Sequence, residues 1–240
     1  MAVYETALRR RETVAEGTMA FYFDKPAGFA HQAGQNALFT LVDPPETDAQ
    51  GPGRTFTIAS APHEPEIMIA TRMRDSAFKR VLKSAALGAR LRIDGPGGVM
   101  VLHEDAARPA VFLAGGIGVT PFLCMARHAA ASRLPHRIVL FYSNRRPEDA
   151  AFLEELRTLE RGNPNYRLVA TMSEAEKSSR PWQGETGFIR PDMLKRHLKD
   201  LKTPIYYSAG PHAMTMSMEV MLADLGVDED DMRSEEFYGY

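Results

Sequence analysis

Residues 111–121 form a stretch that could do chemistry through its backbone rather than its side chains. They read VFLAGGIGVTP, so an apolar run leads into glycines and then into a threonine and a proline. The glycines are Gly115, Gly116 and Gly118. Thr120 is a good helix N-cap and Pro121 suits the first helical position, so the pattern predicts a strand, a tight turn and a fixed helix start. The free N–H groups and the dipole of such a helix start attract a phosphate, and the glycines let an anion approach.

The same turn also has a purely architectural explanation. Glycine tolerates φ > 0, so strand-to-helix turns in α/β folds use it whether or not a ligand binds. The stretch departs from the dinucleotide fingerprint G-x-G-x-x-G, because Pro121 stands where the third glycine would be. Taken alone, it leaves a phosphate role and an architectural role open.

A second candidate lies upstream, in residues 54–60, which read RTFTIAS and follow a Gly/Pro loop. In a strand, Arg54 and Phe56 share one face and Thr57 lies on the other. Taken by itself, this pattern is typical of a plain barrel strand with a surface arginine.

Composition excludes several kinds of chemistry. The chain has 240 residues and a formal net charge of −2, so nothing calls for nucleic acid or an anionic membrane as a partner. Its one cysteine, Cys124, excludes an internal disulfide and an iron–sulfur cluster held by four cysteines of this chain. The seven histidines show no paired helical spacing, so we expect no metal site.

The sequence also bears on location. No apolar run approaches the ~20 residues that span a bilayer. The first residues, MAVYETALRRRETVAEG, lack the apolar segment of a signal peptide. We therefore expect a cytoplasmic protein with no membrane span.

The elements that must position these motifs differ between the two halves of the chain. Up to about residue 105, short β-prone runs are divided by Gly, Pro and Asp, which indicates a barrel or sandwich. The runs are TMAFYFDKP, NALFTLVDPP, RTFTIAS, PEIMIATRM and ARLRIDGP. One predicted helix interrupts them, DSAFKRVLKSAALG, with Asp75 or Ser76 as its cap and Gly88 as its stop.

From about residue 109, strands alternate with helices, which indicates parallel pairing in an open sheet. The strands are PAVFLAG, RIVLFYS, YRLVATM and PIYYSAG, and the helices are PFLCMARHAAAS, PEDAAFLEELRTLERG, PDMLKRHLKDL and PHAMTMSMEVMLADLG. The change near residues 103–109 predicts one domain over residues 1–105 and a second over residues 106–240.

Together the two motifs resemble those of the ferredoxin–NADP+ reductase family. RTFT resembles the family's R-x-Y-[ST] flavin motif, and LAGGIGVTPF resembles its G-G-x-G-x-[TS]-P nicotinamide-nucleotide motif, in the same order and about sixty residues apart. The resemblance covers nearly the whole chain and continues in GPGG (95–98), YSNRRPEDAAFLEEL (142–156), YYSAGP (206–211) and EEFYGY (235–240). It implies an antiparallel, flavin-binding β-barrel followed by an NAD(P)-binding α/β domain with an open parallel sheet.

The resemblance implies a role for each residue of the first motif. Arg54 matches the arginine that pairs with a flavin phosphate, a task that suits the guanidinium fork. Phe56 stands where the family usually has tyrosine; it keeps the ring that lies against the isoalloxazine and lacks the hydroxyl. Thr57 matches the hydroxyl residue near flavin N5, where the hydride arrives. The implied flavin-binding set is Arg54, Thr55, Phe56, Thr57, Arg72, Arg74, Ser76, Ala77 and Phe78.

The helix that begins near Ser76 matches the segment whose N-terminus meets the flavin pyrophosphate. Because FMN has no second phosphate, this match favours FAD over FMN. Basic residues crowd residues 72–92, where only Asp75 is acidic. They form either a solvated helix face with a few phosphate contacts or a dock for an acidic electron carrier.

The resemblance also implies a set for NAD(P)H, in which the glycine turn receives the pyrophosphate. Residues 143–146 follow the second strand of the α/β half and offer hydroxyl and arginine groups with no acid before Glu148, which favours NADPH over NADH. The family usually has Cys-Gly-Pro near residue 209; here an alanine keeps the turn and removes the thiol. The implied set is Gly115, Gly116, Gly118, Thr120, Pro121, Ser143, Asn144, Arg145, Arg146, Ala209, Gly210 and Pro211.

Three residues are implied as catalytic. Besides Thr57, Tyr240 matches the aromatic that covers the flavin in plant-type family members and yields to the nicotinamide. The alternative for Tyr240 is packing against the sheet edge. Glu236 resembles an acid that in some relatives sits near the flavin.

The resemblance therefore implies an FAD-dependent NAD(P)H oxidoreductase. Since the chain has no ligands for a cluster of its own, the electrons would pass to an external carrier such as ferredoxin or flavodoxin, or to an oxygenase component. Two alternatives remain open. One is a reductase that treats flavin as a diffusing substrate, and the other is a non-catalytic module that senses flavin or nucleotide.

Overall fold

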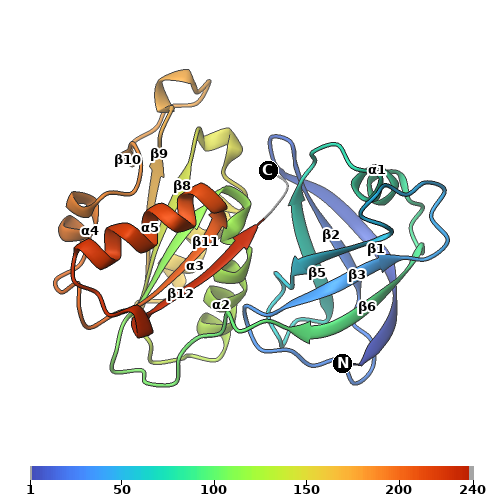
Figure 1. Ribbon diagram of the computed structural model, residues 1–240, viewed down its shortest axis with the longest axis horizontal. Coiled ribbons are helices and arrows are strands. Elements are labelled where there is room, and N and C mark those ends of the chain that lie inside the picture. Colours follow the sequence, from blue (N-terminus) through green and yellow to red (C-terminus); the bar gives the residue numbers. More distant parts are fainter. Residues whose placement is uncertain (1, 238–240) are drawn as a thin grey trace.

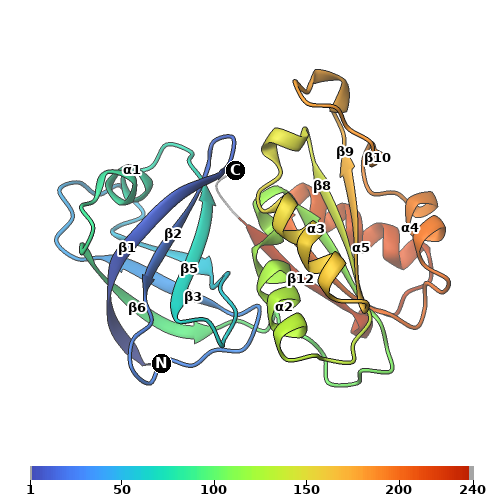
Figure 2. The same cartoon turned by 180° about the vertical axis from the view of Figure 1, so that it is seen from behind.

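The computed structural model describes residues 2–237, which form two halves that lie side by side (Figure 1). Residues 3–97 build an antiparallel sheet, which we call the barrel domain. Residues 110–237 build a parallel sheet with helices on both faces, which we call the α/β domain (Figures 1 and 2). The antiparallel and parallel halves expected from the sequence are thus confirmed. Among the described residues, no helix is long and apolar enough to cross a membrane.

The barrel domain is one curved sheet of six strands. They are β1 (Val3–Ala15), β2 (Thr18–Asp24), β3 (Asn36–Leu41), β4 (Gly53–Thr57), β5 (Glu66–Arg72) and β6 (Arg90–Gly97), in the spatial order β4-β3-β6-β1-β2-β5. Alternate side chains point inward, and fully shielded ones such as Leu8, Phe21, Phe39 and Ile93 form the core.

Helix α1 (Ala77–Ser84) packs onto this core. Its buried residues Phe78, Val81 and Leu82 belong to the same apolar cluster as the strands. Ser76 is the N-cap, and its Oγ accepts a hydrogen bond from the Lys79 N–H at 3.3 Å, which confirms the predicted helix start and its serine cap. The helix ends at Ser84, before the predicted stop at Gly88. The cap and the buried face together fix where the first turn of α1 lies.

The α/β domain holds six parallel strands. They are β7 (Ala110–Gly115), β8 (Ile138–Asn144), β9 (Tyr166–Met172), β10 (Glu185–Thr186), β11 (Ile205–Pro211) and β12 (Met232–Phe237), in the spatial order β10-β9-β8-β7-β11-β12. Helices α2 (Thr120–Ala131) and α3 (Leu153–Gly162) cover one face, and α4 (Pro191–His197) and α5 (His212–Asp224) cover the other (Figures 1 and 2). Central strand β7 is buried on both faces, as parallel sheets require.

The two domains share an apolar interface. Ala20 and Met68 of the barrel domain belong to one buried cluster with Phe122 and Leu123 of α2. A buried apolar contact between two domains limits their relative motion. Side chains at the boundary therefore have defined neighbours in the other domain.

The structure differs from the sequence-based expectation at several elements. The long strand β1 was not predicted, nor were β10 and β12. Residues Gly116–Val119 form a 3₁₀ turn that leads directly into α2, so Thr120 is the first residue of the helix and not its cap. The Thr120 hydroxyl donates to the Ile117 carbonyl at 3.1 Å. Helix α3 begins at Leu153, because Phe152 adopts a left-handed conformation (φ 60°) that ends the preceding turn.

Candidate functional site

A cavity of about 750 Å³ opens between the two domains. Its barrel-domain wall comes from β4, β5 and α1, and its α/β wall comes from the 3₁₀ turn, the start of α2 and the end of β12. The volume falls in the range of small-molecule and cofactor sites. Several of the predicted flavin-binding residues line it: Arg54, Thr55, Phe56, Thr57, Arg72, Arg74, Ser76 and Ala77. The remaining one, Phe78, is buried in the barrel core beneath them.

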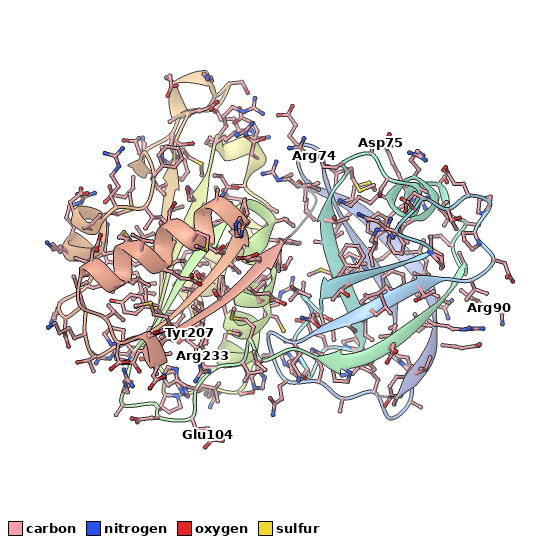
Figure 3. All side chains as sticks on the ribbon, in the orientation of Figure 1. Arg74, Asp75, Arg90, Glu104, Tyr207 and Arg233 are labelled. Atoms are coloured by element: carbon pink, nitrogen blue, oxygen red, sulfur yellow. The ribbon has the colours of Figure 1, made fainter. Side chains whose placement is uncertain are left out.

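Cations crowd the barrel end of this cavity. Arg54, Arg74, Lys79 and Arg80 line the wall there. Arg74 lies at the edge of the barrel domain that faces the α/β domain (Figure 3). Burial lowers the pKa of Lys79, and the neighbouring charges of Arg54 and Arg74 lower it further. Positive charges packed this closely favour an anionic ligand.

Arg54 is held firmly at this end. Its Nη1 donates to the backbone carbonyls of Gln50, Gly51 and Gly53 at 3.3, 2.8 and 2.7 Å. Its Nη2 lies 2.6 and 2.8 Å from the two carboxylate oxygens of Asp48. The loop before β4 thus fixes the guanidinium, and Asp48 was not singled out from the sequence.

The middle of the cavity wall carries an aromatic ring and an unpaired hydroxyl. The Phe56 ring is half-buried and packs at 5.6 Å from the Phe78 ring and 6.1 Å from the Phe39 ring, measured between centroids. Phe56 is therefore partly a core residue while it lines the cavity. The Thr57 Oγ1 is buried and has no hydrogen-bond partner within the described part of the chain. Such an atom is satisfied when a polar ligand group reaches it.

A buried carboxyl lies on the opposite wall. The Asn36 amide, which is paired with Thr57 across β3 and β4, donates to Glu235 Oε1 at 2.7 Å. The other oxygen, Oε2, is buried and has no partner among the described residues. Burial raises the pKa of Glu235, and the Asn36 hydrogen bond only partly opposes this rise. Neither Glu235 nor Asn36 was proposed from the sequence.

The sequence-based candidate on this strand was the next residue, Glu236. It also lines the cavity, and its Oε1 lies 2.8 Å from His212 Nδ1 at the start of α5. Tyr240 lies outside the described residues. The parallel pairing of β12 with β11 sets Glu235 beside Ala209 and Glu236 beside Gly210, and successive residues of a strand point to opposite faces.

The glycine turn borders the α/β end of the cavity. Gly116 has φ +53°, and a Cβ there would lie 3.4 Å from Nη2 of Arg72, which reaches across from β5. That Nη2 also donates to the Asp149 carbonyl at 3.4 Å. A cation from the barrel domain therefore sits over the turn that the sequence assigned to a pyrophosphate.

The other glycines of the turn have packing roles. A Cβ on Gly118 would lie 2.3 Å from the Ala209 carbonyl oxygen and 2.6 Å from the Gly210 nitrogen. A Cβ on Gly115 would meet Pro211 at 3.1 Å. The absence of side chains thus lets the glycine turn lie directly against the Ala209-Gly210-Pro211 turn, which brings together two predicted motifs that are nearly 100 residues apart in sequence.

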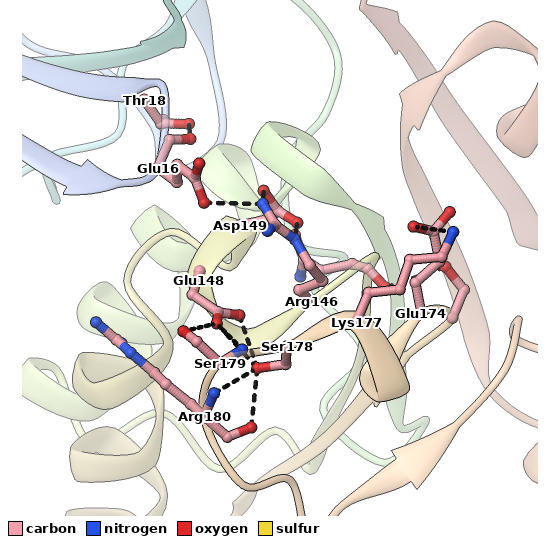
Figure 4. A network of polar contacts seen from close by, with 12 residues as sticks. Glu16, Thr18, Arg146, Glu148, Asp149, Glu174, Lys177, Ser178, Ser179 and Arg180 are labelled. Atoms are coloured by element: carbon pink, nitrogen blue, oxygen red, sulfur yellow. Dashed lines mark hydrogen bonds and ion pairs between the residues drawn. The ribbon is translucent and has the colours of Figure 1, made fainter.

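The segment after β8 uses its two arginines differently. Arg146 donates to both Asp149 carboxylate oxygens at 3.0 and 3.1 Å, and to Glu16 of the barrel domain at 2.8 Å (Figure 4). These carboxylates raise the pKa of Arg146. Arg145, in contrast, is exposed. Ser143 is half-exposed, while the Asn144 amide is buried with neither atom partnered among the described residues.

A second cavity, of about 790 Å³, lies between the end of β1 and the start of α3. Acidic side chains line it, and they have partners in the protein: Glu16 pairs with Arg146, and Glu148 accepts hydrogen bonds from Ser178 and Ser179 (Figure 4). The hydroxyls of Ser179 and Ser178 lower the pKa of Glu148 to about 2. Five glutamates and two arginines line this second cavity, whereas five basic and four acidic side chains line the first. The first cavity therefore suits a phosphate-bearing ligand better, and we assign the candidate site to it.

Comparisons with known proteins agree with this geometry. Residues 112–219 match the family model described as the oxidoreductase NAD-binding domain. A glycine betaine monooxygenase reductase subunit from Chromohalobacter salexigens is 27% identical over 230 residues, which are 95% of this chain and 61% of the relative. A ferredoxin–NADP reductase B from Sorangium cellulosum is 29% identical over 175 residues, which are 71% of this chain and 68% of the relative.

The fold is shared with solved structures. A ferredoxin NADP+ reductase from Neisseria gonorrhoeae with bound FAD and NADP superimposes with a TM-score of 0.80 at 18% identity, over 98% of each chain. The chain spans between 38% and 61% of the length of four of the curated relatives that it matches. In its sequence matches and its two-domain fold, the chain is similar to ferredoxin–NADP+ reductase-like, flavin-dependent oxidoreductases.

Proposed function

We propose that the protein is an FAD-dependent NAD(P)H oxidoreductase that passes electrons from the nucleotide, through a bound flavin, to a separate acceptor. One observation carries the proposal. A single cavity between the domains is lined by a cation cluster at a helix start, by Ile117 and Thr120 next to the turn glycines, and by the side chains of Thr57 and Glu235. The Thr57 Oγ1 and Glu235 Oε2 atoms are buried and lack partners in the described chain.

The residues present fit a flavin. The cation cluster suits a phosphate, the half-buried Phe56 ring offers an apolar surface, and the unpaired Thr57 hydroxyl can meet a polar edge of an aromatic ring system. When bound, the flavin supplies hydride acceptance and single-electron release. The protein supplies binding, orientation and electrostatics.

Each side chain then has a defined task. Arg54 and Lys79 hold the phosphate end, because their charges converge at the start of α1. Thr57 donates a hydrogen bond to the ring system. Glu235, whose pKa is raised by burial, faces the cavity from the opposite wall and is oriented by Asn36.

The nucleotide binds on the α/β side of the same cavity in this proposal. The glycine turn and Arg72 receive the pyrophosphate, since both a backbone turn and a guanidinium meet there. NADPH is favoured over NADH because Arg145 is exposed beside Ser143, while Arg146 is already engaged by carboxylates. The turn at Ala209 contributes backbone only.

The acceptor in this proposal is a separate protein, such as a ferredoxin, a flavodoxin or an oxygenase component. The support is that relatives carry the names of a monooxygenase reductase subunit and a ferredoxin–NADP reductase. The exposed arginines at the rim of the cavity suit an acidic carrier.

The test is steady-state oxidation of NADPH and of NADH with ferricyanide as acceptor, after free flavin has been removed. The proposal predicts turnover in proportion to bound flavin, with a lower KM for NADPH. Turnover that rises in step with added free flavin would instead support a reductase of diffusible flavin. Bound flavin with no turnover would support a non-catalytic sensor and contradict the proposal.

A further inference from the structure

The loop between β3 and β4 brings a carboxylate of the protein itself to the phosphate end of the cavity. Both carboxylate oxygens of Asp48 lie within hydrogen-bond distance of Arg54 Nη2, at 2.6 and 2.8 Å. Its Oδ2 also accepts from the Ala77 N–H, the first residue of α1, at 3.1 Å. Its Oδ1 accepts from the Gln50 N–H at 3.0 Å. An anion thus already occupies the point where the guanidinium and the helix start converge.

The two partners of this ion pair differ in how firmly they are held. Arg54 is anchored by three backbone carbonyls, and 16% of its side chain is exposed. For Asp48, 31% of the side chain is exposed, and it reaches the site from a loop. Asp48 can therefore turn into solvent while Arg54 stays in place. The Arg54 guanidinium lowers the pKa of Asp48, so the carboxylate is ionised at neutral pH.

We propose that Asp48 is a built-in competitor for the flavin phosphate, so that flavin binding exchanges a carboxylate for a phosphate on Arg54 Nη2 and the Ala77 N–H. This inference rests on the proposed function, because it takes the cavity to be the flavin site. It assigns the loop residue the task of setting how tightly phosphate-bearing flavins are held.

Physical chemistry limits the size of the effect. A partly exposed ion pair contributes little net free energy, so the carboxylate can leave at a small cost. A phosphate carries more charge than a carboxylate and more acceptor oxygens, so it wins the exchange. Removal of the competitor should therefore strengthen phosphate binding modestly and should not create a new site.

The test compares the wild-type protein with Asp48→Asn, using riboflavin, FMN and FAD as probes and quenching of flavin fluorescence as the readout. Asp43→Asn is the matched control, because Asp43 lies in the same loop and carries the same charge, but it is exposed and does not line the cavity. For Asp48→Asn we expect the Kd of FMN and FAD to fall about tenfold, as for loss of one charge-assisted competitor. Riboflavin has no phosphate, so its Kd should not change, and Asp43→Asn should leave all three values at the wild-type level.

A kinetic readout on the flavin-loaded protein gives the same information. After dilution, bound FAD should be released more slowly from Asp48→Asn than from the wild type. If Asp48→Asn does not fold, Asp48→Ala can be used in its place. Weaker or unchanged binding of FMN and FAD overturns the inference and leaves the proposed function standing. An equal gain for riboflavin also overturns it, since the loop would then be a general obstruction. If no protein binds any flavin, the proposed function fails and this inference fails with it.

Discussion

The barrel end and the α/β end of the cavity present positive charge in different ways. At the barrel end, Arg54 and the start of α1 come from one domain and converge on a carboxylate of the same domain. At the α/β end, the guanidinium over the glycine turn belongs to Arg72, which comes from the barrel domain. The first anion site is thus complete within one domain, while the second requires groups from both domains. Flavin binding and nucleotide binding should therefore respond to different substitutions.

The largest expected effect is at the barrel end. Arg54→Ala removes the anchored guanidinium, and flavin affinity should fall about a hundredfold, which corresponds to loss of two charge-assisted hydrogen bonds. Flavin content after purification and the Kd of added FAD measure this. Arg90→Ala, an exposed arginine of the same domain, is the control and should keep its flavin. Unchanged flavin content in Arg54→Ala would remove the role assigned to this residue.

The next prediction tests whether Arg72 of the barrel domain supplies the positive charge at the glycine turn. Arg72→Ala should raise the KM for both NADPH and NADH about tenfold, because one charged partner of the pyrophosphate is lost. Flavin content should stay near the wild-type level. If Arg72→Ala instead loses flavin and keeps the wild-type KM for both nucleotides, Arg72 binds the flavin at the barrel end. The two ends of the cavity would then not differ as described.

A smaller effect should separate the two arginines after β8. Arg145→Ala should raise the KM for NADPH several-fold, by about the strength of one charge-assisted hydrogen bond, and leave that for NADH unchanged. Arg146→Ala should change both KM values together, because Arg146 joins Asp149 to Glu16 across the domain boundary. The ratio of the two KM values measures this. If the ratio of the KM for NADPH to the KM for NADH changed only in Arg146→Ala, Arg146 and not Arg145 would be the residue that selects NADPH.

The smallest effect concerns the buried carboxyl between the ends. Burial raises the folded-state pKa of Glu235, so its stabilising contribution is present at low pH and is lost as the pH rises through that raised value. Glu235→Gln resembles the protonated form at every pH. Its stability relative to the wild type, measured by urea unfolding of the flavin-free proteins, should therefore increase from pH 4.5 to pH 8. A difference that does not change with pH would contradict the assigned ionisation.

The sequence predicted the framework of both anion sites. The alternation of strands and helices after residue 109 gave the parallel sheet, and the runs before residue 105 gave most of the barrel. Strand β1 was missed because the continuous exposed, charged run from Arg9 to Glu12 interrupts the alternation that the buried Thr6 and Leu8 begin. Tertiary pairing with β2 and β6 makes it a strand.

Individual site residues were harder to predict than the motifs. The choice between Glu235 and Glu236 depends on the register of β12 against β11, and a shift of one residue exchanges the two faces. No local pattern gives that register. The position of the Asp48 carboxylate depends on the path of the loop over residues 43–52. The Pro, Asp and Gly residues of this loop predict turns, but they do not predict where the Asp48 side chain lies.

The central claim is that one cavity brings a flavin and a nicotinamide nucleotide together. The most direct test is the visible spectrum of the purified protein without oxygen, recorded as NADPH, and in a fresh sample NADH, is added in steps. We predict a yellow protein that bleaches completely at one NADPH per flavin, and faster than with NADH. A yellow protein that neither nucleotide bleaches would contradict the claim, and the glycine turn would then serve only the packing of β11.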